Sequence, residues 1–376
     1  MTQHPAGPDR RRGPFRAGER VQLTDVKGRK YTTMLTVDGY FQSARGRLRH
    51  TDIIGRDEGS VIDTDDGHRL LALRPLISDY VLSMPRGATP IYPKDAAQIV
   101  SIADIFPGAR VVEAGLGSGA LALSLLAAIG PSGHLTSVER REDFATIAMA
   151  NVESWYGDDI PPWTVHVGDL NDVMEDMEDG SVDHVLLDML APWENLDGAM
   201  RVLRPGGVIL AYVATTTQMS RFVEELRTTY TFTEVEASET VVRTWHLEGL
   251  AVRPDHRMVA HTGFLVVARR LAPLSEPCWR SAAPRNSPIR TRCRGMTRRS
   301  LLSRSTRSHP RSSGRCFATS SSAPTWNRPD PLTSARMGRP DPDGAAAMCG
   351  RVLRQVGMPA GYWEERRGSE WALQAA

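Results

Sequence analysis

The chain has 376 residues, of which 41% are hydrophobic and 24% charged, with a formal net charge of +2, and this length is enough for two or three domains. The average hides a change near Leu271: residues 1–271 carry a net charge of −9 and residues 272–376 a net charge of +11. All four cysteines lie in the second part, which excludes disulfides and cysteine-ligated metals as supports of the first.

No apolar run is long enough to span a bilayer. The amino-terminal end is polar, and the three arginines Arg10, Arg11 and Arg12 are followed by no apolar segment, which excludes a secretory signal. We therefore expect a cytoplasmic protein with no membrane partner, and we expect residues 1–14 to be disordered.

Residues 15–75 predict a small all-β domain. Short apolar stretches alternate with turn residues such as Lys27-Gly28 and Asp65-Asp66-Gly67, a spacing typical of antiparallel strands. The predicted strands are 19–25, 30–35, 60–63 and 69–73, and residues 74–85 are expected to form a bridge.

From Pro93 the pattern changes to strands that alternate with helices, which predicts a mostly parallel sheet covered by helices on both faces. We assign this domain to residues 76–271. The predicted strands are 110–113, 134–139, 164–167, 184–188 and 208–213. The predicted helices are 94–102, 118–129, 141–155, one from Trp193, and 218–229. Trp245–Val252 and Thr262–Arg269 are predicted to close the domain as an antiparallel pair.

The tail, residues 272–376, is rich in Arg, Ser and Pro and shows little periodicity. Such segments bury too little apolar surface to offset the entropy of the chain. Three interpretations are open: a basic arm for RNA phosphates, a disordered extension, or the product of a shifted reading frame in GC-rich DNA. We favour the last two together, with a short helix expected over 350–376.

The most informative segment is Val111–Ala120, VVEAGLGSGA. An apolar strand reaches the carboxylate of Glu113, and a glycine-rich turn then leads into a predicted helix. Glycine lets the backbone approach a ligand closely, and the helix start offers free N–H groups. Alone, this segment indicates only a nucleotide-like cofactor.

Four acidic residues sharpen this interpretation. Glu113, Glu139 and Asp188 close apolar strands, and Asp169 follows the third strand, 164–167, by two residues. In a parallel sheet these strand ends share one edge, so we expect the four carboxylates to converge. A carboxylate at Glu139 can accept both hydroxyls of a ribose, while Asp169 can accept from an adenine amino group with Leu170 against the ring. Glu113 would face the methionine portion of S-adenosylmethionine.

This pattern predicts S-adenosyl-L-methionine as the cofactor. The predicted cofactor-binding residues are Val112, Glu113, Ala114, Gly115, Leu116, Gly117, Ser118, Gly119, Glu139, Arg140, Phe144, Gly168, Asp169, Leu170 and Asp188.

A dinucleotide enzyme is the competing interpretation, because Gly115, Gly117 and Ala120 satisfy the G-x-G-x-x-G/A spacing. Glu113 weighs against it, since its negative charge would lie near a pyrophosphate. The acids after the third and fourth strands also lack a role in hydride transfer. We therefore favour the methyl donor.

Two further segments are more particular than the glycine loop: Ile91–Ala96, IYPKDA, and Leu187–Trp193, LDMLAPW. With them the chain resembles the tRNA (adenine-58-N1)-methyltransferase family in its single-gene prokaryotic form, from about Phe15 to Arg270. The resemblance also includes the segments Gly18–Val21, Leu82–Gly87 and His261–Val266.

The resemblance implies a class I methyltransferase domain behind a small β-domain, assembled as a homotetramer. Its substrate would be an adenine in the T-loop of tRNA, extruded so that N1 can be reached, and the reaction needs no metal. Asp188 would accept a hydrogen bond from the adenine N6 amino group and Tyr92 would flank the base. The alternatives are a helix cap for Asp188 before Trp193, an ordinary half-buried tyrosine, and core packing for Trp193.

Two other functions stay open: methylation of a small molecule or protein, and a non-catalytic RNA-binding module. The folded part is net acidic, so RNA binding would need local basic patches. The candidates are Arg45, Arg47, Arg49, His50, Arg86, Lys94, Arg253, His256 and Arg257.

Overall fold

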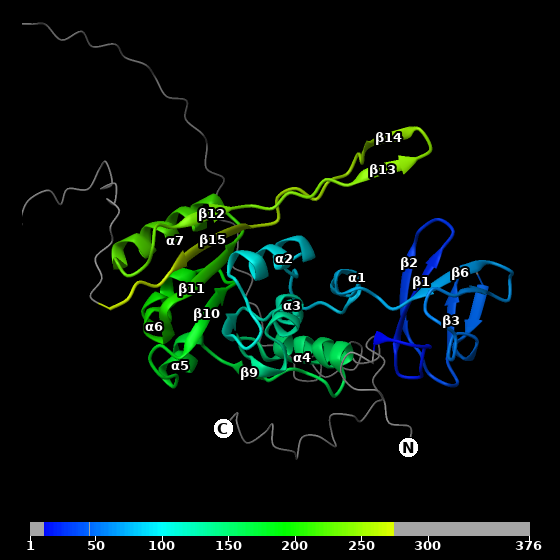
Figure 1. Cartoon of the computed structure of the whole chain (residues 1–376), viewed down its shortest axis with the longest axis horizontal. Coiled ribbons are helices and arrows are strands. Elements are labelled where there is room, and N and C mark those ends of the chain that lie inside the picture. Colours follow the sequence, from blue (N-terminus) through cyan, green and yellow to red (C-terminus); the bar gives the residue numbers. More distant parts are fainter. Residues whose placement is uncertain (1–10, 45, 274–376) are drawn as a thin grey trace, which may run out of the picture. The chain divides into compact units, whose positions relative to one another are not determined.

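The computed structural model describes residues 11–44 and 46–273 (Figure 1). The first part is all-β, as predicted. β1, β2, β5 and β6 form an antiparallel sheet in the order β2-β1-β6-β5, and β3 pairs with β4. The strands are β1 (Arg20–Asp25), β2 (Lys30–Met34), β3 (Tyr40–Ser43), β4 (Gly46–Arg49), β5 (Val61–Asp63) and β6 (Arg69–Leu73).

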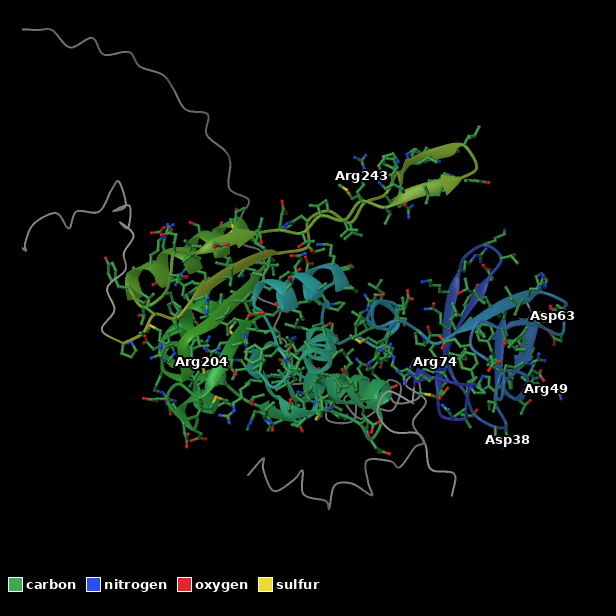
Figure 2. The ribbon with its side chains drawn as sticks, in the orientation of Figure 1. Asp38, Arg49, Asp63, Arg74, Arg204 and Arg243 are labelled. Carbon is green, nitrogen blue, oxygen red and sulfur yellow. The ribbon has the colours of Figure 1, made fainter. Side chains whose placement is uncertain are left out.

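Alternation along the strands builds the core of this part. Val21 and Leu23 of β1 and Leu70 and Ala72 of β6 are completely buried, because side chains two residues apart lie on the same face of a strand. Arg74, which follows β6 and is labelled in Figure 2, forms ion pairs with Glu19 at 2.7 Å and with Glu58 at 3.0 Å.

The second part is built on a seven-stranded sheet in the order β12-β15-β11-β10-β7-β8-β9. The five strands β7 to β11 are parallel, and β15 and β12 add antiparallel at one side. The strands are β7 (Arg110–Ala114), β8 (His134–Glu139), β9 (Trp163–Val167), β10 (Val182–Leu187), β11 (Leu203–Val213), β12 (Glu236–Ser238) and β15 (Phe264–Arg269).

Helices cover both faces of this sheet (Figure 1). On one face α1, α2, α3 and α4 pack against Val111 and Leu135, and on the other α5, α6 and α7 pack against Val112 and Val185. Burial on both sides explains why the central strands are continuous apolar runs. The helices are α1 (Ile77–Ser83), α2 (Pro93–Ile102), α3 (Ala120–Ile129), α4 (Glu142–Tyr156), α5 (Leu170–Glu175), α6 (Leu196–Val202) and α7 (Thr216–Thr229).

The strand order reverses between β7 and β10: the chain runs from β7 outward through β8 and β9, then returns to the other side of β7. In open parallel sheets ligands bind beyond the carboxyl ends of the strands at such a reversal. The glycine loop follows β7 and Asp188 follows β10, so both lie at this point.

The predicted closing pair was wrong. Trp245–Val252 folds on itself instead, as β13 (Trp245–Glu248) pairs with β14 (Ala251–Pro254). Gly249, at a φ of +53°, makes the two-residue turn between them possible. β15 pairs with β11 and β12 in the main sheet, where its apolar residues are buried.

Three local predictions also differ from the structure. The strand predicted at 208–213 is longer, because β11 begins at Leu203 and includes Arg204–Gly207 as an irregularity in its register with β10. The bridge before Pro85 contains α1, and α5 was not predicted; with seven and six residues, both are too short for a clear helical period.

In the described residues no helix is long and apolar enough to cross a membrane. The tail predicted from 272, its expected helix over 350–376, residues 1–10 and Arg45 lie outside the described residues, except for Ala272 and Pro273.

Candidate active site

The glycine loop joins β7 to α3 and brings the backbone close to two other segments. Gly115 has a φ of +88°, and a Cβ added to it would lie 1.9 Å from the carbonyl oxygen of Asp188. Gly119 has a φ of +79°, and its Cβ would lie 3.2 Å from the carbonyl oxygen of Ala148 in α4. Only glycine combines a left-handed backbone with such close approach.

A segment just before α2 lies against the glycine loop. The Ser118 hydroxyl accepts hydrogen bonds from the N–H groups of Gly87 and Ala88, at 3.2 and 3.3 Å, and donates to the Ala88 carbonyl at 3.1 Å. The buried Asn151 side chain donates to the carbonyls of Pro85 and Ser118, at 2.9 and 3.0 Å. Asn151 was not singled out from the sequence, although a buried amide in an apolar helix face is a usable signal.

Glu113 is buried among other acids. Its Oε2 accepts a hydrogen bond from the Ser137 hydroxyl at 2.8 Å, while Oε1 is buried and has no hydrogen-bond partner among the described residues. The pKa of Glu113 is raised to about 8, chiefly by burial; the hydrogen bond from Ser137 lowers it, and the nearby Asp188 and Glu139 carboxylates raise it. Burial makes the ionised form of such a group costly, and a positive group bound beside it would stabilise that form.

Glu139 and Asp188 flank the loop from two strand ends. Glu139 accepts the N–H of Gly117 at 2.9 Å and that of Arg141 at 3.2 Å. The Asp188 N–H donates to the Ala114 carbonyl at 2.8 Å and continues the pairing of β10 with β7. Burial, and secondarily the Glu139 charge, raise the pKa of Asp188 to about 7.

Asp169 stands at the end of the next strand, β9, and its carboxylate is engaged locally. Oδ1 caps α5 by accepting the N–H of Asn171 at 2.9 Å, and Oδ2 accepts from Arg140. Both contacts lower the pKa of Asp169. Three of the four predicted acids thus act on one another electrostatically, with Asp169 at the neighbouring strand end.

The other predicted cofactor residues differ in exposure and contacts. The side chains of Val112, Ala114, Leu116 and Leu170 are buried in the core, so we expect them to meet a ligand through backbone atoms. Phe144 is half-buried, with the Arg141 guanidinium 3.3 Å from its ring centre. The Gly168 N–H donates to the Glu139 carbonyl at 3.0 Å.

Tyr92 is the residue that precedes α2, and its side chain is half-buried. Its carbonyl accepts the N–H groups of Asp95 and Ala96, at 2.9 and 3.0 Å. The capping interpretation of Asp188 was wrong: the short helix at Pro192–Asn195 is preceded by Ala191 and has no side-chain cap. Trp193 packs against the core beneath Arg221, whose guanidinium lies 4.0 Å from the ring centre.

Beside Tyr92, a buried network joins α2 to the legs of the hairpin arm, which we define as residues 239–262, including β13 and β14. The Lys94 ammonium donates to Asp95 at 2.8 Å, to the Thr240 carbonyl at 2.7 Å and to the Thr262 hydroxyl at 2.6 Å. Thr262 also donates to Asp95 at 2.6 Å.

Two of the residues considered for RNA contact are therefore unsuited to it. The Lys94 side chain is only 9% exposed and is fully engaged by this network. His50 is buried, and its Nδ1 accepts the Thr36 N–H at 3.1 Å. The sequence did not reveal the Lys94 network because its partners come from segments far apart along the chain.

The arrangement suits a cationic ligand. Three carboxylates border the glycine loop, and one of them has a buried oxygen with no partner among the described residues. A sulfonium and an ammonium would be attracted here, whereas a pyrophosphate would meet like charge. The residues thus fit S-adenosylmethionine better than a dinucleotide.

Comparison with known proteins agrees with this geometry. Residues 13–62 match a family model described as TrmI-like N-terminal, and residues 71–250 match one described as the tRNA methyltransferase complex GCD14 subunit. A tRNA (adenine(58)-N(1))-methyltransferase from Thermus thermophilus is 34% identical over 248 residues, which cover 66% of this chain and 95% of the relative.

The chain belongs to the tRNA (adenine-58-N1)-methyltransferase family. Its fold is that of the class I methyltransferases, as predicted. The crystal structure of the tRNA (m1A58) methyltransferase from Aquifex aeolicus superposes with a TM-score of 0.59 at 26% identity, covering 69% of this chain and all of that one. The crystal structure of a SAM-dependent O-methyltransferase from Thermotoga maritima superposes with a TM-score of 0.64 at 29% identity, covering 70% of this chain and 96% of that one.

Proposed function

We propose that this protein transfers a methyl group from S-adenosylmethionine to N1 of adenine 58 in the T-loop of tRNA. The observation that carries the proposal is the meeting of the glycine loop with Glu113, Glu139 and Asp188 at the reversal of the strand order. Membership of the family supplies the substrate, since its curated relatives are named for this reaction.

The cofactor supplies a methyl group on a positively charged sulfur. The glycine loop and the free Oε1 of Glu113 would hold the methionine portion with its positive charges. Glu139 would accept the ribose hydroxyls, since each of its oxygens keeps a lone pair beside its backbone hydrogen bond. Asp169 would accept from the adenine amino group of the cofactor.

Adenine N1 carries a lone pair and no proton, so the attack needs no general base. Asp188 would accept a hydrogen bond from the N6 amino group and stabilise the positive charge that the ring acquires. Tyr92, at the start of α2, would contact the face or edge of the extruded base, as aromatic side chains do with unstacked purines.

The hairpin arm supports assembly with further copies, and we expect a homotetramer. A two-stranded hairpin is marginally stable alone in water, yet this one exposes large apolar side chains. Its three arginines are balanced by three acids, which favours pairing with a second copy over an RNA backbone. The exposed apolar residues are Val241, Val242, Trp245, Leu247, Leu250, Val252, Met258 and Val259. A tRNA substrate supports a cytoplasmic location.

The test is methyl transfer from labelled S-adenosylmethionine to unmodified tRNA, with a tRNA carrying guanine at position 58 as the control. We expect label at adenine N1 in the first tRNA and none in the second. Asp188→Ala should retain cofactor binding and lose on the order of 10²–10³ of the turnover, while Asp172→Ala, on the exposed side of α5, should not. Label on a small molecule or on protein would favour the alternative function.

A further inference from the structure

Three polar groups line up across neighbouring strands on one face of the sheet. Glu113 of β7 lies directly opposite Ser137 of β8 in the register, and Leu135, two residues before Ser137, lies opposite Trp163 of β9. Residues two apart share a face of a strand, so Glu113, Ser137 and Trp163 project from the same side of the sheet. Strand register therefore fixes their order.

The direction of the hydrogen bonds follows from the chemistry of the groups. The indole Nε1–H of Trp163 is a donor only, and it donates to the Ser137 oxygen at 2.9 Å. The single hydroxyl proton of Ser137 is then directed to Oε2 of Glu113, at 2.8 Å. Ser137 is completely buried, so water does not compete for this proton.

Of the two carboxylate oxygens of Glu113, Oε2 therefore accepts a hydrogen bond from Ser137 and Oε1 remains for another group. Oε1 is buried and has no partner among the residues that the structure describes. The hydrogen bond from Ser137 favours the ionised carboxylate and lowers the pKa of Glu113 against the effect of burial. Ser137 thus favours the ionised form of Glu113, the form that a bound cation requires.

The charged groups around Glu113 do not supply that cation. Asp188 beyond β10 and Glu139 at the end of β8 both raise the pKa of Glu113. Of the arginines at this edge within the described chain, Arg140 pairs with Asp169 and Arg141 with Glu139. None of these groups gives Glu113 a positive partner, so a cationic ligand would be the group that favours its ionised form.

We propose that Ser137, oriented by Trp163, is a positioning residue for the methyl donor: it favours the ionised form of Glu113 and orients the carboxylate so that Oε1 faces the cationic methionine portion. This inference rests on the proposed function, because it takes S-adenosylmethionine as the ligand. It adds two residues that touch neither the cofactor nor the adenine.

The experiment measures the dissociation constant of S-adenosylmethionine by calorimetry between pH 6.5 and 9.5, for the wild-type chain and for Ser137→Ala. The quantity of interest is the dissociation constant of Ser137→Ala divided by that of the wild-type chain at each pH. The titration of the ligand affects both constants equally and cancels in this ratio. A hydrogen bond to a charged group is equivalent to about one pKa unit or more. We expect a ratio of about ten at pH 7 that falls toward one at the alkaline end.

Two further backgrounds separate positioning from folding. In a Glu113→Gln background, Ser137→Ala should change the constant by less than twofold at every pH, because no ionised carboxylate is left to hold. Trp163→Phe should raise the constant a few-fold alone and add nothing to Ser137→Ala, since the indole acts through the hydroxyl. If Ser137→Ala does not fold, Ser137→Cys, a weaker donor of similar size, should give a smaller ratio with the same pH trend.

A ratio that stays constant with pH overturns the inference, because a general loss of structure weakens binding equally at all pH values. If the wild-type chain methylates tRNA while the ratio is constant, only the role of Ser137 is lost. If the wild-type chain does not bind S-adenosylmethionine, the proposed function and the inference are both overturned.

Discussion

The contact between Gly115 and Asp188 predicts the outcome of a single added methyl group. In Gly115→Ala the new Cβ would lie 1.9 Å from the Asp188 carbonyl oxygen. Ordinary contact requires at least 3.4 Å, so the loop and the end of β10 must separate by about 1.5 Å. Neither atom belongs to a flexible side chain, so the backbone itself must move.

The expected cost has two parts. A non-glycine residue at a φ of +88° costs about 1–2 kcal/mol, and the backbone clash adds to it. For catalysis, a displacement of about 1 Å lowers a rate by about 10²-fold. We therefore expect Gly115→Ala to lower the free energy of unfolding by at least about 3 kcal/mol and the turnover by about 10²-fold.

Gly59→Ala is the matched control, because Gly59 has a φ of +90° and no atom of the described residues lies within 4 Å of its added Cβ. It should show the backbone cost alone, with normal turnover. Urea denaturation measures both stabilities, and single-turnover methylation of tRNA measures the chemistry. Equal loss of stability in the two variants, with normal turnover in Gly115→Ala, would refute the close-approach argument.

Three other predictions concern buried polar groups. Because the pKa of Asp188 is raised to about 7 and the ionised form is the acceptor, kcat/KM for S-adenosylmethionine should fall about fivefold or more from pH 7 to pH 6. Asp188→Asn should remove this titration. A pH profile that Asp188→Asn leaves unchanged would count against the role of Asp188. Asn151→Leu leaves two backbone carbonyls without their donor and should lower the free energy of unfolding by about 2–5 kcal/mol; a change below 1 kcal/mol would contradict this. Asp95→Asn leaves the Lys94 ammonium buried without its carboxylate and should lower the free energy of unfolding by about 3–5 kcal/mol. The double variant Asp95→Asn, Lys94→Met should lower it less. If thermal or urea unfolding shows the double variant to be the less stable one, the unpaired charge is not the cause.

Local patterns predicted much of the sheet, because strands buried on both faces are apolar runs that end at turns. β8 was predicted at its observed bounds, His134–Glu139, and β7 and α2 within one residue. The acids at the strand ends followed from the same logic, since parallel order brings carboxyl ends together. The class I fold was therefore predictable once the strands were found.

What escaped prediction depends on pairing between distant segments. The register that sets Ser137 opposite Glu113 is a property of the assembled sheet, and nothing near Ser137 in sequence reveals it. Lys94 meets Thr262 across 168 positions, so its burial could not be inferred from its neighbours. The hairpin β13–β14 was missed because its turn, Gly249-Leu250, was taken as part of a single strand over 245–252.

The hairpin arm divides into a fixed base and a free tip. Lys94 fastens both legs at the base, whereas Leu250 at the tip is fully exposed, and Arg243 marks the stretch between them (Figure 2). An insertion at the base would therefore reach α2 and Tyr92 through Lys94, whereas an insertion at the tip should act on the contacts expected with a second copy and leave the network at the base in place.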